Sequence, residues 1–167
     1  MKPRQSFAAP WSKTLKVVTS LCVVLLTGIA LMGVFGLSPR QLPARLGLII
    51  LPALILPGCA LFMVRGYTLT EGRLLIHRLG WSSSLDLASL ISATPDPLAA
   101  AGSIRACGIG GLFVFCGRFR NRKLGNYRLY ATDLQRSVVL RFADRVVVVT
   151  PDAPDKFAAE IMGAKPS

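Results

Sequence analysis

The stretch that decides the fold class reads VVTSLCVVLLTGIALMGVFGL and runs from Val17 to Leu37 without a charged residue. A second uncharged stretch, LGLIILPALILPGCALFMV, covers Leu46–Val64 and lies between Arg45 and Arg65. A hydrocarbon layer of about 30 Å is crossed by about 20 helical residues, so each stretch is long enough to span a bilayer. The sequence therefore predicts a hairpin of two transmembrane helices, residues 17–37 and 46–64, joined by a short loop at residues 38–45.

Each stretch has an alternative assignment. Lys13 and Lys16 precede the first stretch, as in a secretory signal, but the stretch is longer than the ~7–15 apolar residues of a signal core, and no small-x-small cleavage site ends it. The second stretch contains Pro52 and Pro57. A transmembrane helix tolerates proline, usually with a kink, because neighbouring groups satisfy the freed carbonyls. A re-entrant segment is the alternative there.

The distribution of positive charge predicts the orientation of the hairpin. Seven basic residues flank its outer ends and two lie in its loop: Lys2, Arg4, Lys13, Lys16, Arg65, Arg73 and Arg78, against Arg40 and Arg45. Loops rich in Lys and Arg stay in the cytoplasm. We therefore expect a basic cytoplasmic N-terminus at residues 1–16, an external loop at 38–45, and a cytoplasmic region after residue 64.

Composition separates the chain into an anchor and one domain. Of 167 residues 52% are hydrophobic, and the excess is concentrated in the first 65, so the remainder has the ordinary mixture of a single compact domain. The formal net charge is +12. Beside a bilayer this charge favours attraction to anionic headgroups, at about 1 kcal/mol per basic residue. No nucleic acid is expected as a partner, because no groove-reading helix or RNA-binding motif is present.

From residue 66 onward the pattern is that of short strands and turns. The clearest strands form a hairpin at residues 67–78, with Glu71-Gly72 as its turn, and a valine-rich pair at residues 137–142 and 145–150. Further strands are expected near 81–87, 90–94, 112–115 and 127–132, which gives seven or so short strands. Residues 98–111 are expected to be irregular, and a polar segment runs through Gly125. Pro154 suits the first position of a helix, and Phe157 and Ile161 recur at helical spacing. One helix is thus expected at about 155–163, closing an open end of a barrel or sandwich, with 164–167 as a tail.

Four parts of this region carry a family resemblance: residues 66–74 (GYTLTEGRL), 110–119 (GGLFVFCGRF), 124–132 (LGNYRLYAT) and 149–157 (VTPDAPDKF). In this order and spacing they resemble the bacterial pleckstrin-homology (PH-like) domain family, in the branch preceded by membrane helices, over residues 66–163. The resemblance implies a mainly-β bent barrel, partly open and capped by one C-terminal helix, with no catalytic activity and no cofactor. Ala153 stands where a residue that caps the helix would often be found, which leaves Asp152 as the local substitute.

The candidate binding residues are Arg118, Arg120, Arg122 and Lys123. If this segment is extended, the three arginines point to one face and Phe119 to the other. Guanidinium groups suit phosphate or carboxylate ligands because of their forked donor geometry. The alternative is a solvated hairpin tip whose charges only keep the surface soluble.

Other residues are expected to have structural roles. His77 lacks a neighbouring nucleophile, and no metal-ligand spacing occurs. Cys22 and Cys59 are expected to be small packing residues in the apolar stretches. Cys107 and Cys116 are expected to be buried free thiols, with a disulfide between them as the alternative. Gly108–Gly111 lacks the Lys-Ser/Thr of a phosphate loop and is expected to form a turn or bulge. Trp11 is expected at the membrane interface and Trp81 in the core. No catalytic, cofactor-binding or metal site is predicted.

The functional prediction is a non-enzymatic interaction or scaffolding role at the cytoplasmic face of a bacterial inner membrane. The partner would be a protein, which includes a second copy of the chain. The alternative is a reader of anionic lipid headgroups through Arg118–Lys123. Sequence alone does not separate the two, because arginines serve either purpose.

Overall fold

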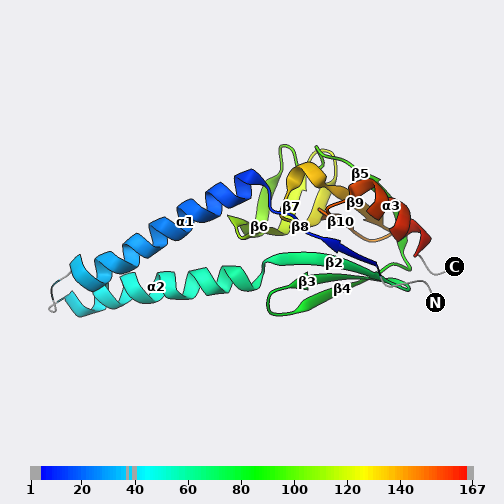
Figure 1. Cartoon of the computed structure of the whole chain (residues 1–167). Coiled ribbons are helices and arrows are strands. Elements are labelled where there is room, and N and C mark those ends of the chain that lie inside the picture. Colours follow the sequence, from blue (N-terminus) through cyan, green and yellow to red (C-terminus); the bar gives the residue numbers. More distant parts are fainter. Residues whose placement is uncertain (1–4, 37, 39–40, 165–167) are drawn as a thin grey trace.

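The computed structural model describes residues 5–36, 38 and 41–164. A helical hairpin projects from one end of a β-rich domain (Figure 1). Helix α1 (Lys13–Leu31) continues into a π-helical segment, η1 (Met32–Gly36), and α2 (Leu42–Leu61) returns to the domain. Both helices are long and apolar enough to cross a membrane. Some predicted bounds lie outside the described residues: the end of the first span at Leu37, residues 39–40 of the loop, residues 1–4 of the N-terminus and residues 165–167 of the tail.

The start of α1 is earlier than the apolar stretch suggests. Ser12 caps the helix, since its side chain accepts a hydrogen bond from the Leu15 amide at 3.1 Å, and this is a standard N-cap arrangement. Helix α2 runs unbroken through Pro52 and Pro57.

The two helices converge toward their loop and diverge toward the domain (Figure 1). The close approach lies at Gly33, where a Cβ would come within 2.9 Å of the Leu48 Cβ. At Gly28 and Gly58 a Cβ would meet nothing within 4 Å. Small residues permit such close helix contacts in membranes, so the hairpin is held mainly at its loop end.

Sheet A has the order β1-β2-β3-β4, with β1 (Gln5–Ala8), β2 (Val64–Thr70), β3 (Arg73–Arg78) and β4 (Ser82–Asp86). The β2–β3 hairpin confirms the predicted strands and turn. Strand β1 was not predicted: residues 1–16 were expected to be only a basic terminus, yet Gln5–Ala8 pairs antiparallel with Gly66–Leu69 of β2. The side chain of Phe7 is buried in the domain core. The N-terminal segment is therefore part of the domain.

Sheet B has the order β5-β9-β10-β8-β7-β6. Its strands are β5 (Leu90–Pro95), β6 (Ile104–Leu112), β7 (Val114–Asn121), β8 (Gly125–Ala131), β9 (Val138–Phe142) and β10 (Val146–Val149). Strands β8 and β10 pair in parallel, and the other neighbours are antiparallel. The expectation of an irregular segment at residues 98–111 is wrong for residues 104–111, which lie in β6. The described part of the chain holds ten strands rather than about seven.

Two apolar clusters cover the two faces of sheet B. The main core lies between sheets A and B, and helix α3 (Pro154–Gly163) contributes Phe157 and Ile161 to it. A second cluster, with Phe119, Tyr127 and Leu129, covers the opposite face of sheet B. As expected from its sequence, α3 begins with Pro154 after Ala153, which provides no side-chain cap. The expectation that Asp152 substitutes as the cap is wrong, because its carboxylate accepts from the Ala153 amide at 3.0 Å and not from an amide of the first helical turn.

Candidate functional site

An arginine pair extends the inner face of sheet B beyond the apolar core. Cys116 of β7 lies opposite Tyr130 of β8, and both side chains belong to the core between the sheets. Two positions away from this pair, Arg118 of β7 lies directly opposite Arg128 of β8. Because strand side chains alternate between faces, both arginines lie on the core-facing side of the sheet, beyond the end of the apolar packing.

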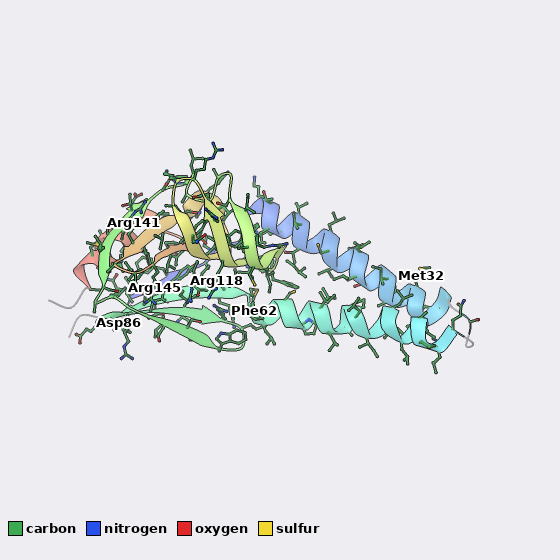
Figure 2. The ribbon with its side chains drawn as sticks, turned by 180° about the vertical axis from the view of Figure 1, so that it is seen from behind. Met32, Phe62, Asp86, Arg118, Arg141 and Arg145 are labelled. Carbon is green, nitrogen blue, oxygen red and sulfur yellow. The ribbon has the colours of Figure 1, made fainter. Side chains whose placement is uncertain are left out.

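Arg145 adds a third guanidinium. It immediately precedes β10, in which Val147 pairs with Arg128. Figure 2 shows Arg118 and Arg145 on the side of sheet B that faces sheet A, and Arg141 on the opposite side. We call Arg118, Arg128 and Arg145 the arginine face. All three line a hollow of about 450 Å³.

The arginine face carries little compensating negative charge. Arg145 has an acidic neighbour, Asp144, whose Oδ2 is 3.8 Å from its Nη1, and its guanidinium also packs over the Phe142 ring at 5.2 Å. The Nε of Arg145 is buried without a hydrogen-bond partner among the described residues. Within that same part of the chain, neither Arg118 nor Arg128 forms an ion pair. Like charges directly opposite on neighbouring strands destabilise a sheet, and an anion between these two arginines would relieve that repulsion.

The structure divides the predicted cluster. Arg118 and Arg120 lie on β7, exposed and on one face, whereas Arg122 and Lys123 fall in the β7–β8 turn. Lys123 forms an ion pair with Asp96. Arg120 and Arg122 line a separate hollow of about 760 Å³. The arginine face therefore shares only Arg118 with the predicted cluster.

Phe119 lies on the face opposite its neighbouring arginines, as expected for an extended segment. It is buried and stacks on Tyr127 with ring centroids 6.1 Å apart. Arg128 and Arg145 were missed in the sequence analysis, because their proximity to Arg118 depends on strand register. The usable signal was the basic residue in the strand Tyr127–Thr132, which a correct β7–β8 pairing would have placed opposite Arg118.

Toward the two apolar helices, the inner face continues through Arg78. Its guanidinium carbon lies 5.1 Å from the centre of the Tyr130 ring and 5.7 Å from that of Phe62, which follows α2. Burial raises the pKa of the Cys116 thiol, and the positive charge of Arg78 opposes that rise. The arginine face is thus adjacent to the junction between the domain and α2.

The remaining candidates have structural explanations. His77 lies between two hydroxyls, with Nε2 2.8 Å from Thr68 Oγ1 and Nδ1 3.0 Å from Ser82 Oγ. The predicted bulge lies at Gly111, which has φ +102° and falls at the register shift between Gly110 and Leu112. Gly108 pairs regularly with Gly117, and a Cβ there would come within 2.2 Å of the Cys116 carbonyl oxygen. Cys116 is buried as expected, but the expectation is wrong for Cys107, which is exposed because it lies on the edge strand β6. Among the described residues, no three His, Cys, Asp or Glu side chains are placed to hold a metal ion.

A comparison with curated proteins finds no match to this chain. A comparison with protein-family models finds the Bacterial PH domain at residues 65–165. This range begins at the second residue of β2, so it leaves out β1, and it includes the helix α3 that packs against the core. The order of elements, two long apolar helices followed by a β-rich domain closed by a C-terminal helix, agrees with the match. The chain belongs to the Bacterial PH domain family, with a two-helix apolar hairpin preceding the matched domain.

Proposed function

We propose that this protein is a non-enzymatic interaction module, anchored by its helical hairpin so that the domain lies against the cytoplasmic face of the membrane. The excess of basic residues at the outer ends of the hairpin supports the orientation.

The ligand that the geometry favours is an anionic lipid headgroup bound by the arginine face. The observation that carries this proposal is the direct cross-strand pairing of Arg118 with Arg128, without an acidic partner among the described residues. Two forked guanidinium groups at this spacing suit phosphate oxygens.

The arginine face also lies at the height where headgroups are found. Strand β6 contacts both membrane helices, and β7, which carries Arg118, is the next strand in the sheet. Neighbouring strands are about 4.8 Å apart. The headgroup layer extends roughly 5–8 Å beyond each side of the hydrocarbon core, so phosphates in that layer are within reach of long arginine side chains.

A protein partner that adds a strand to sheet B is less well supported. Strand β6 is the exposed edge on the side of the helices, but its pairing with β7 is interrupted by two irregularities, at Arg105/Cys107 and Gly110/Leu112. Bulges of this kind hinder edge-to-edge pairing. The edge of β6 therefore offers a poor template for another chain.

The test uses the full-length protein in a neutral detergent, with phosphatidylglycerol or phosphatidylcholine added and retained lipids counted by native mass spectrometry. We expect selective retention of phosphatidylglycerol that weakens with salt. The double variant Arg118→Ala/Arg128→Ala should lose this selectivity by about 10-fold or more, since a hydrogen bond to a charged group contributes about 1.5–3 kcal/mol.

The matched control is Arg73→Ala/Arg141→Ala, which removes the same charge from two exposed positions: Arg73 at the start of β3 in sheet A, and Arg141 on the opposite side of sheet B (Figure 2). It should retain phosphatidylglycerol like the parent protein. Equal retention of both lipids by the parent, or an equal loss in the two double variants, would overturn the proposal.

A further inference from the structure

Four exposed apolar side chains gather where α2 meets the domain. Leu61 ends α2 and Phe62 follows it, while Leu79 and Trp81 lie in the turn between β3 and β4. Leu79 is 48% exposed and Trp81 is 41% exposed. The expectation that Trp81 lies in the core is therefore wrong. Large apolar side chains grouped on a surface indicate a contact with another apolar phase.

The β3–β4 turn is fixed to the end of α2. The rings of Phe62 and Trp81 meet edge to face with centroids 5.0 Å apart, and a Cβ at Gly80 would lie 3.2 Å from Leu61 Cδ2. The Arg78 amide donates to the Trp81 carbonyl at 2.9 Å, which closes the turn. The turn therefore cannot change its height in the membrane independently of α2.

Arg78 places a positive charge at the same level. Its guanidinium carbon lies 5.3 Å from the centre of the Trp81 ring and 5.7 Å from that of Phe62. A cation packed on aromatic rings, with its stem covered by apolar groups, is the arrangement that long basic side chains adopt at a bilayer surface. Tryptophan is likewise enriched at that depth because its ring is amphipathic.

We propose that the β3–β4 turn is a third membrane contact, in which Leu79 and Trp81 insert into the interfacial layer of the leaflet where α2 ends. Helix α2 has 20 residues, which matches the ~30 Å of the hydrocarbon core at about 1.5 Å per residue. Phe62 then lies at the core boundary, and its contact with Trp81 places the turn at the same depth. The hairpin and the turn together fix the tilt of the domain on the bilayer, independently of any headgroup bound at the arginine face.

The test is depth-dependent quenching of tryptophan fluorescence in the full-length protein reconstituted into phosphatidylcholine bilayers. The chain has two tryptophans, so Trp11→Phe leaves Trp81 as the only one. We expect lipids brominated near the headgroup to quench Trp81 more than lipids brominated near the chain end, and aqueous iodide to quench it weakly.

The matched control moves the fluorophore to the far edge of sheet B. In Trp11→Phe/Trp81→Phe/Ile91→Trp the tryptophan occupies an exposed position on β5, and iodide should quench it strongly while brominated lipids should not. The inference is overturned if Trp81 behaves like this control. It is also overturned if Trp81 is protected from both quenchers, because protein rather than lipid would then cover the turn.

Discussion

Thr19 of α1 and Phe113 of the β6–β7 turn are joined by a hydrogen bond of 3.1 Å, in which the Phe113 amide donates to the Thr19 hydroxyl. The same hydroxyl donates to the Gly111 carbonyl at 3.3 Å, and the Thr19 side chain is buried. Phe113 has φ +64°, which is rare for a residue other than glycine, and its ring packs on Trp11 at 6.2 Å. The first turns of α1 are therefore packed against the domain.

Replacing this hydroxyl should loosen the contact between helix and domain. Thr19→Val keeps the shape but leaves the Phe113 amide without its partner, which costs about 1–3 kcal/mol. We expect Thr19→Val to lower the midpoint of thermal unfolding in detergent. The control is Thr14→Val, at an exposed position on the same helix, and its midpoint should be close to that of the parent protein. Equal midpoints for the two variants would show that the hydrogen bond contributes nothing to stability.

The N-terminal strand should be essential for a stable domain. Phe7 packs against Phe157 of α3 with ring centroids 5.1 Å apart and is 5% exposed. Phe7→Ala should destabilise the protein by about 3–5 kcal/mol, as expected for a buried phenylalanine, whereas Ser6→Ala, at an exposed position on β1, should have little effect. Thermal unfolding followed by circular dichroism measures both, and an unaffected Phe7→Ala variant would show that β1 is dispensable.

Alkaline pH should destabilise the domain through Tyr67. Its hydroxyl donates to the Tyr130 carbonyl at 2.7 Å and accepts from the Thr150 amide at 3.1 Å. Burial raises the pKa of Tyr67 from 10.0 to about 12. The folded state thus binds this proton more tightly than the unfolded state, so its stabilising contribution is complete below about pH 10 and is lost as the pH rises toward about 12.

The measurement is the unfolding midpoint between neutral pH and about pH 12. Tyr67→Phe should be less stable than the parent at neutral pH, because the Thr150 amide loses its acceptor, but it should lose less on going to alkaline pH. Burial also raises the pKa of Tyr127, so part of the alkaline loss should remain in both proteins. Parallel pH profiles for parent and variant would contradict the assignment to Tyr67.

The two domain cysteines should differ in reactivity and can report the orientation. Cys107 is exposed, whereas Cys116 is buried and burial raises its pKa, so a maleimide should label Cys107 first and Cys116 only on unfolding. If the domain lies in the cytoplasm as proposed, a membrane-impermeant maleimide should label Cys107 only after the membrane of the cells has been permeabilised. Cys107→Ser should abolish the fast reaction, and labelling of Cys107 in intact cells would reverse the proposed topology.

The fold could be predicted where local patterns decide it. The β2–β3 hairpin follows from a two-residue turn between β-favouring residues, and β9 and β10 follow from alternation and consecutive valines. Helix α3 follows from Pro154 and its apolar spacing. In each case the signal lies within about ten residues of chain, so no distant contact is needed to read it.

The missed strands depend on distant partners. Four residues form β1, and the strand pairs with β2 only after the chain has passed through both long helices. Strand β6 carries glycines that weaken any strand pattern. Gly108 of β6 lies directly opposite Gly117 of β7, and a Cβ at either position would clash with the backbone of the other strand. The arginine face could not be predicted for the same reason, since cross-strand register brings Arg118 and Arg128 together.

The pairing of β1 with β2 has a consequence for biosynthesis. Gln5 lies opposite Leu69 in one sheet, although all of the helical hairpin lies between them in the chain. For a hairpin inserted in a bilayer as proposed, the sheet can close only when both ends of the hairpin emerge on the same side. In a chain that crosses the bilayer only once, β1 and β2 would lie on opposite sides of the membrane, and Phe7 would be absent from the core. Folding of the domain would then act as a check on correct insertion, and misinserted chains would stay unfolded and open to proteolysis.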